Sequence, residues 1–268
     1  PAKGGRRGFA LNGVHMAVVD SYISDFKSTQ YDSQAVWGAF GQGPYKIQNN
    51  YLEAAAENVM FGGADPTISN LIPADIEIRG NYFFKPMAWK TGGWVVKNLF
   101  EMKIGRRILA EGNVMDYNFM SADQDGAALV WKSENQSGTA PWSITEDLTF
   151  RSNIVRHAAG ALRMSNNKGN AQPTARILME NNLFYDISMA NWGDGVGLGE
   201  FLQPDDNTQD LVVSHNTYDG DGQKVVFFLG ATLRSGFIFR DNIVSRNLQG
   251  VMGNGYAEGT ASLAKFAP

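Results

Sequence analysis

The sequence of 268 residues contains no cysteine, which excludes disulfide bonds and thiolate metal sites. It has no apolar run close to the roughly 18 residues that a membrane-spanning helix needs. Charge of one sign is not concentrated either, because the net charge is −4 and the basic residues are scattered along the chain. Proteins that bind nucleic acids usually carry a basic patch, so we predict neither a nucleic-acid partner nor a membrane span.

One short pattern recurs along the whole sequence. It consists of two apolar residues in alternate positions, two mostly polar residues, an asparagine and, two positions later, another apolar residue. Eight copies recur with a period of about 32 residues, which is typical of repeat architectures, and serine replaces asparagine in the first copy. The copies are Met16-Val18-Ser21-Ile23, Tyr45-Ile47-Asn50-Leu52, Ile76-Ile78-Asn81-Phe83, Ile108-Ala110-Asn113-Met115, Leu148-Phe150-Asn153-Val155, Ile177-Met179-Asn182-Phe184, Leu211-Val213-Asn216-Tyr218 and Phe237-Phe239-Asn242-Val244.

The apolar alternation in each copy predicts strands with one buried face. Asparagine suits the corner between two strands, because its side chain bonds nearby backbone and it tolerates left-handed conformations. In stacked coils, asparagine amides can also bond to the same corner above and below. The apolar spacing of three and four residues that a helical solenoid requires is missing. We therefore predict an all-β fold, a parallel β-helix of about eight coils that forms one domain over residues 1–268.

A third strand is predicted after the corner of each coil. In three coils its inward residues follow the asparagine by nine and eleven positions, at Val59/Phe61, Leu162/Met164 and Val225/Phe227. In the coils of Asn81, Asn113 and Asn182 an insertion displaces this strand, which we place at residues 94–98, 128–132 and 195–199. Positions ten and twelve beyond the asparagine then point outward. The loops that follow are long and emerge on one side, where binding residues usually lie.

The start of the sequence shows no amphipathic helix that would cover the first coil. Repeat proteins usually need a polar cap, because uncovered strand edges invite pairing. We therefore expect either that upstream coils are missing from this sequence or that another chain covers this end through self-association.

Several segments carry a family resemblance: residues 49–54 (NNYLEA), 57–63 (ENVMFGG), 92–103 (GGWVVKNLFEMK), 108–114 (ILAEGNV) and 140–142 (APW). They resemble bacterial right-handed parallel β-helix proteins of the pectate-lyase-like superfamily. The resemblance implies a right-handed helix, further coils before Pro1, and a bacterial protein that is secreted or held at the cell surface or in the periplasm. The Arg-x-Pro-x-x-Arg catalytic signature of pectate lyases is absent, which argues against pectate as the substrate.

Three successive coils are predicted to present a cation on the outer face of the third strand: Lys97, Lys132 and Arg163. Adjacent coils lie about 4.8 Å apart, so these cations would form a ladder that matches the carboxylates of an acidic polysaccharide. In a lyase, one cation neutralises the uronate and a lysine or arginine of lowered pKa removes the proton α to the carboxyl group. We predict Arg163 or Lys132 as this base and Lys97 as a substrate-binding residue. The alternative is that all three are ordinary solvated charges.

The next coil carries alternate glycines in residues 192–200 (WGDGVGLGE). Bare backbone would let a sugar ring lie against the strand, although the glycines would equally relieve crowding under a loop. Asp194 and Glu200 flank this strip and are predicted to bind substrate or Ca²⁺, or to act as acid and base. Asp123 and Asp125 are equally suitable carboxylates. A hydrolase would need two carboxyl groups about 5 Å apart, or about 6.5–9.5 Å apart for inversion.

Two tryptophans lie beside or within the long loops. Trp142 and Trp192 are predicted to stack on sugar faces, with loop anchoring as the alternative. The three histidines, His15, His157 and His215, lie too far apart in the repeat to form a metal site, so any metal ion remains unidentified.

The favoured prediction is an extracellular, lyase-like enzyme that cleaves an acidic, uronate-containing polysaccharide by β-elimination. One alternative is a non-catalytic carbohydrate-binding or adhesin-like β-helix that uses the same groove. The other is a glycoside hydrolase that uses paired carboxylates from Asp194, Glu200, Asp123 or Asp125.

Overall fold

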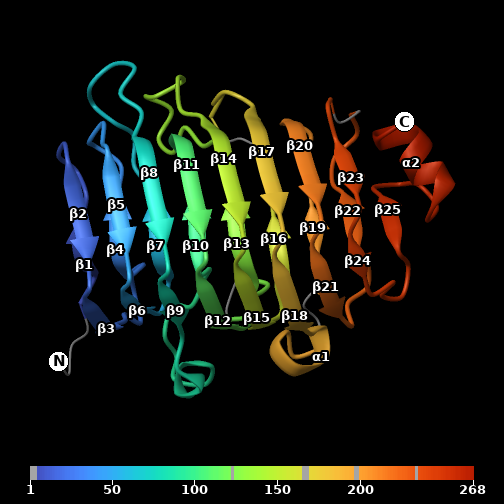
Figure 1. Ribbon diagram of the computed structural model, residues 1–268, viewed down its shortest axis with the longest axis horizontal. Coiled ribbons are helices and arrows are strands. Elements are labelled where there is room, and N and C mark those ends of the chain that lie inside the picture. The colour runs from blue at the N-terminus through green and yellow to red at the C-terminus, as the bar shows by residue number, and fades with distance from the viewer. Residues whose placement is uncertain (1–4, 122–123, 165–168, 196–198, 233–234) are drawn as a thin grey trace.

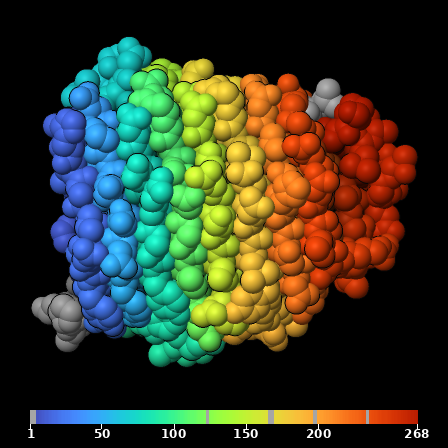
Figure 2. Space-filling view, viewed as in Figure 1, coloured from blue at the N-terminus to red at the C-terminus, as the bar shows by residue number. Residues whose placement is uncertain are grey.

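The computed structural model describes residues 5–121, 124–164, 169–195, 199–232 and 235–268. Its strands form three all-parallel sheets, named here sheet A, sheet B and sheet C. Successive turns of the chain add one strand to each sheet in turn, so the fold is the predicted right-handed parallel β-helix. The coils follow one another along the long axis of the molecule (Figure 1), and each forms a band in the space-filling view (Figure 2).

Every coil visits the sheets in the order A, B, C. Sheet A contains β1 (Arg7–Ala10), β4 (Gln34–Gly38), β7 (Glu57–Phe61), β10 (Phe100–Met102), β13 (Ala127–Trp131), β16 (Gly160–Arg163), β19 (Leu202–Gln203), β22 (Val226–Phe228) and β25 (Val251–Gly253). Sheet B contains β2 (Met16–Val19), β5 (Tyr45–Gln48), β8 (Ala74–Arg79), β11 (Gly105–Glu111), β14 (Thr145–Arg151), β17 (Thr174–Glu180), β20 (Thr208–Ser214) and β23 (Ile238–Arg240). Sheet C contains β3 (Tyr22–Phe26), β6 (Tyr51–Ala54), β9 (Tyr82–Phe84), β12 (Val114–Asn118), β15 (Ile154–Ala158), β18 (Leu183–Ile187), β21 (Thr217–Gly220) and β24 (Ile243–Val244).

The repeated asparagines form a continuous ladder at the corner between sheets B and C, which confirms the stacking predicted from the sequence. Asn113 Nδ2 donates to Asn153 Oδ1 at 2.9 Å, and Asn153 Nδ2 donates to Asn182 Oδ1 at 3.1 Å. The six ladder asparagines are each at most 3% exposed: Asn50, Asn81, Asn113, Asn153, Asn182 and Asn216. Because buried polar groups are costly unless they are paired, this ladder lets amides occupy the interior without loss of stability.

The interior is filled by the apolar residues of the repeat and of the third strands. Phe150 of sheet B packs against Trp131 of sheet A, with ring centroids 5.2 Å apart, and against Phe184 of sheet C. All three side chains are fully buried. Burial of one such side chain contributes about 1.5–3 kcal/mol, so every coil adds its own share to a single elongated core.

The third strands correct part of the sequence-based placement. In the coil of Asn113, the expected strand at residues 128–132 is found as β13. In the coil of Asn81 it is β10 rather than residues 94–98, and in the coil of Asn182 it is β19 rather than residues 195–199, of which 196–198 lie outside the described residues. In the coil of Asn216 the predicted inward residues were Val225 and Phe227. The strand residues that face inward are Val226 and Phe228, each one position later. Inserted loops of unequal length shift the strand, and periodicity alone does not reveal by how much.

The two ends of the solenoid differ. At one end, helix α2 (Thr260–Phe266) covers the last coil, and its Phe266 ring stacks on Phe228 with centroids 5.6 Å apart. At the other end, β1, β2 and β3 are the outermost strands of their sheets, and within the described residues no further strand pairs with them. Phe9 and Tyr22 are 46% and 73% exposed there. This end therefore presents free backbone groups and apolar side chains.

The longest connections border sheet A on both of its sides. Residues 62–73 and 132–144 lead from sheet A to sheet B, and residues 85–99 and 188–201 lead from sheet C to sheet A. The latter pair contains the short helices η1 (Met87–Trp89) and α1 (Met189–Trp192). In Figure 1 these loops project beyond the strands at the top and bottom of the view. The outer face of sheet A thus lies between two rims of loops.

Candidate functional site on sheet A

The three cations singled out in the sequence reach one open cavity on the outer face of sheet A. This cavity, the sheet-A cleft, has a volume of about 450 Å³. Its lining includes Lys97, Lys132 and Arg163. The other lining residues are Asn98, Glu101, Lys103, Gln124, Asp125, Val130, Glu134 and Gln136. The structure therefore brings together polar side chains of both signs of charge from three successive coils, those of β10, β13 and β16.

The cations do not form the single row that the sequence analysis predicted. The strand position of Arg163 is taken by Val130 in the preceding coil and by Glu101 in the coil before that. Lys97 precedes β10 and Lys132 follows β13, so neither belongs to that row. The ladder hypothesis is wrong in its register for two reasons. It placed the third strand of the Asn81 coil several residues too early, and Lys132 stands two positions beyond Val130, the residue that pairs with Arg163.

A different pair of cations is in register. Lys103 and Lys132 each follow the last residue of their strand, and their backbone nitrogens donate to equivalent carbonyls of the neighbouring coils, Phe61 O at 2.8 Å and Met102 O at 2.9 Å. Sequence reasoning missed Lys103. The buried residues Phe100 and Met102, spaced by two, were the signal that could have identified it as an outward residue beyond the strand end.

Buried carboxylates hold these two lysines in place. Lys132 Nζ lies 2.6 Å from Glu134 Oε2, while Lys103 Nζ lies 3.0 Å from Glu101 Oε1 and 3.7 Å from Glu134 Oε2. Burial alone would lower the pKa of Lys103, but Glu101 and Glu134 outweigh it and raise that pKa above its ordinary value. Lys103 is therefore a fixed positive charge rather than a base.

Lys97 lies at the boundary of the cleft nearest the start of the chain. Its Nζ donates to Asp32 Oδ2 at 2.8 Å. Burial opposes the charge of Lys97, but the Glu57 carboxyl and then Asp32 raise its pKa above the usual value. Glu57 itself is fully buried, and burial, followed by the carboxylates of Glu101 and Asp32, raises the pKa of Glu57 to about 8, although Lys97 opposes the shift. Lys97 is thus also a fixed cation.

Arg163 occupies the opposite part of the cleft, where it makes an ion pair with Asp125. Burial lowers the pKa of the Arg163 guanidinium, and Glu200 opposes this effect. Arg163, Asp125 and Glu200 also line a small adjoining hollow over β16. The structure therefore brings two of the candidate carboxylates to the same arginine. Asp123 lies outside the described residues.

Glu200 is only 5% exposed, and burial raises its pKa to about 7 although Arg163 and Lys224 oppose the shift. Its Oε1 atom has no hydrogen-bond partner within the described part of the chain. A carboxyl group in such surroundings holds a proton close to neutral pH. This is the property expected of a general acid.

The remaining predicted residues do not line the sheet-A cleft in the part of the chain that the structure describes. Trp142 belongs to the loop from sheet A to sheet B, and its indole nitrogen donates to Leu71 O at 3.1 Å. Trp192, on α1, packs against Tyr117 and against His157 with centroids 5.4 and 5.6 Å apart. Asp194, 57% exposed at its side chain, pairs with Lys90 at 2.7 Å. These contacts anchor the loops that border sheet A.

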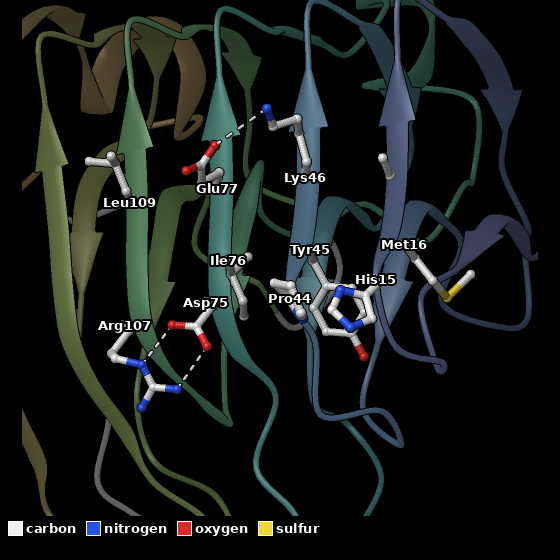
Figure 3. Close-up of a pocket in the computed structure, with 11 residues that line it drawn as sticks. His15, Met16, Pro44, Tyr45, Lys46, Asp75, Ile76, Glu77, Arg107 and Leu109 are labelled. Carbon is white, nitrogen blue, oxygen red and sulfur yellow. Dashed lines mark hydrogen bonds and ion pairs between the residues drawn. The ribbon is translucent and has the colours of Figure 1, made fainter.

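Another hollow, of about 510 Å³, lies on the outer face of sheet B (Figure 3). Its charged residues pair among themselves: Arg107 Nε donates to Asp75 Oδ1 at 2.7 Å, and Lys46 Nζ lies 3.9 Å from Glu77 Oε2. Leu109, on the neighbouring strand β11, lies beside Glu77 and adds an apolar side chain to the lining. None of the residues predicted as functional lines this hollow.

Metal ligands are not clustered within the described residues, where no group of three or more His, Asp or Glu side chains is arranged to hold an ion. In the same part of the chain, no helix has the length and apolar character needed to cross a membrane. No protein-family model matches the sequence, and no curated protein matches it significantly. The geometry of the sheet-A cleft is therefore the basis on which a function can be assigned to this chain.

Proposed function

We propose that this chain is an extracellular protein of the pectate-lyase-like superfamily that binds an acidic polysaccharide along sheet A and cleaves it by β-elimination. The observation that carries the proposal is the convergence of four cations, Lys97, Lys103, Lys132 and Arg163, on one open cavity between two rims of loops. Among the described residues, the same lining contains three carboxylates, Glu101, Asp125 and Glu134, so the cations outnumber them by one. A rigid scaffold flanked by loops is a common setting for binding sites.

The cations of the cleft have unequal roles in the proposal. Lys103 and Lys132 are held by Glu134, so they offer positive charge at a fixed place on the sheet. A uronate carboxylate beside Lys132 would be neutralised, which makes the proton on the carbon α to it more acidic. Preorganised charge of this kind stabilises the anion that develops in the transition state.

Arg163 is the proposed base, because burial lowers the pKa of its guanidinium. In its neutral form it takes the α proton. The electrons of that carbon–hydrogen bond form a carbon–carbon double bond, and the bond to the β oxygen breaks. The leaving oxygen then takes a proton from water or from a neighbouring acid. Release of the Asp125 contact must come first, since that ion pair favours the charged guanidinium.

A glycoside hydrolase is the second candidate, and Glu200 favours it. Glu200 and Asp125 line the same hollow, and their surroundings differ: burial keeps Glu200 protonated to about pH 7, whereas Asp125 pairs with Arg163. Two carboxyl groups with such different surroundings suit an acid and a base.

A panel of uronate polymers distinguishes the candidates. A lyase produces an unsaturated sugar that absorbs ultraviolet light, a hydrolase produces reducing ends without that absorbance, and a binding protein produces neither. We expect the ultraviolet signal, and we expect Arg163→Ala to abolish turnover while some binding remains. Arg240→Ala, which removes an exposed arginine of sheet B, is the matched control. Reducing ends that depend on Glu200, or binding without any product, would refute the lyase.

A further inference from the structure

A second cavity lies on the outer face of sheet A, closer to the start of the chain. This cavity, the N-terminal cavity, has a volume of about 300 Å³, and Arg6, Arg7, Tyr31 and Trp37 belong to its lining. The Arg7 guanidinium lies 3.8 Å from the centroid of the Trp37 ring, and that of Arg6 lies 4.8 Å from the Tyr31 centroid. Two arginines are thus supported by aromatic faces, which is a common arrangement for cations that meet an anionic ligand.

The site is built by hydrogen bonds as well as by stacking. Arg7 Nε donates to Gln34 Oε1 at 3.3 Å, and Gln34 Nε2 donates to the buried Glu57 at 2.8 Å. Gln34 is only 2% exposed. Within the described residues, the two terminal nitrogens of Arg7 have no hydrogen-bond partner. They remain able to make the two-pronged contact that arginine forms with a carboxylate.

The N-terminal cavity and the sheet-A cleft share a boundary. Asp32 lines the first, Lys97 lines the second, and the ion pair between them is 2.8 Å long. Both cavities open on the same face, because Trp37 of the first and Arg163 of the second belong to one row of paired positions that crosses sheet A through Met60, Glu101 and Val130.

We infer that the N-terminal cavity is a remote subsite for an anionic sugar of the same polysaccharide chain, with Arg7 and Arg6 contacting its carboxylate and Tyr31 contacting its ring. This inference rests on the proposed function of the sheet-A cleft and extends the binding face beyond it. Tyr31 is 54% exposed, so its ring is accessible to a sugar.

The sheet itself sets the length of ligand that fills both places. Five strand steps separate β1 from β16 in sheet A, which corresponds to about 24 Å at about 4.8 Å per step. A disaccharide is too short to reach from Arg163 to Arg7, whereas an extended octasaccharide is long enough. Affinity should therefore rise with chain length, since both contacts then belong to one ligand.

Calorimetric titration of the full chain with a uronate disaccharide and octasaccharide tests this. We expect the octasaccharide to bind more tightly, and Arg7→Gln to weaken its binding about tenfold, the effect of losing one hydrogen bond to a charged group. The affinity of the Arg7→Gln variant for the disaccharide should stay within twofold of that of the parent protein. Tyr31→Ala, at an exposed ring, should reduce octasaccharide affinity without risk to the fold.

Arg240→Gln provides the control, because it removes the same charge from sheet B. The inference is overturned if the octasaccharide gains nothing over the disaccharide, if Arg7→Gln weakens both ligands equally, or if Arg240→Gln has the same effect. Failure of the proposed function looks different, because the parent protein would then bind neither oligomer.

Discussion

Asn153 and Asn182, in adjacent coils, are joined by two hydrogen bonds to a single atom. Both the backbone nitrogen and the amide nitrogen of Asn153 donate to Asn182 Oδ1, at 2.9 and 3.1 Å. The same amide nitrogen also donates to Ala110 O of the coil before. One side chain thus links three coils at the corner between sheets B and C.

The ladder makes a direct prediction for stability. Asn153→Ala and Asn182→Ala should each lower the free energy of unfolding by roughly 1–3 kcal/mol, because buried partners lose their hydrogen bonds. Denaturant unfolding followed by circular dichroism measures the change. The exposed Asn254→Ala is the control and should unfold like the parent protein. Corner variants as stable as this control would show that the ladder contributes little.

A second prediction concerns pH. Burial raises the pKa of Glu200 to about 7 in the folded protein, from an ordinary value of 4.5. A raised pKa means that the folded state holds the proton of Glu200 more tightly than the unfolded state does. Protonated Glu200 therefore contributes to the free energy of unfolding, in full below about pH 4.5, and this contribution disappears as the pH rises through about 7. Its full size would be roughly 3 kcal/mol. We therefore expect Glu200→Gln to reduce the loss of stability between about pH 5 and about pH 8.

The comparison is made by measuring unfolding free energies of the two proteins at both pH values. Since glutamine does not titrate, the difference between the proteins isolates Glu200 from other groups. Parallel pH profiles would contradict the assignment of a raised pKa to this residue.

A third prediction concerns the electrostatics of the sheet-A cleft. Binding of a uronate oligomer should weaken as salt rises, since attraction between charges is screened over about 8–10 Å at physiological ionic strength. Arg163→Ala should weaken binding more than Arg163→Lys, because lysine keeps the charge but lacks the two-pronged contact. Fluorescence or calorimetric titrations over a salt series provide the measurement. Binding insensitive to salt would remove the cations of the cleft from the model of recognition.

A fourth prediction concerns the outermost strands β1, β2 and β3. Their exposed apolar residues and free edges should make the 268-residue chain self-associate as its concentration rises. Tyr22→Lys, at a residue 73% exposed on β3, should reduce this association. Light scattering measures this association over a concentration series. The control is Ile68→Lys, at an exposed apolar residue in the loop between β7 and β8. A monomer at all concentrations would refute the prediction.

The sequence by itself was sufficient to predict the parallel β-helix and the stacked corners. Leu148, Phe150 and Asn153 carry that information locally, because alternation of period two defines a buried strand face and the asparagine defines where it turns. Repetition of the pattern then requires the copies to stack, since one coil alone cannot bury its apolar face.

The candidate site depended on the tertiary structure. Lys97 was placed on a strand that begins later, at Phe100, and Lys103 was overlooked because its role depends on where that strand ends. Nor did spacing indicate that Lys132 pairs with Glu134, or that Arg163 meets both Asp125 and Glu200. Loops of unequal length separate the corners from the third strands. The strand register, and with it the position of each charge on sheet A, is therefore set by packing between coils rather than by the local pattern.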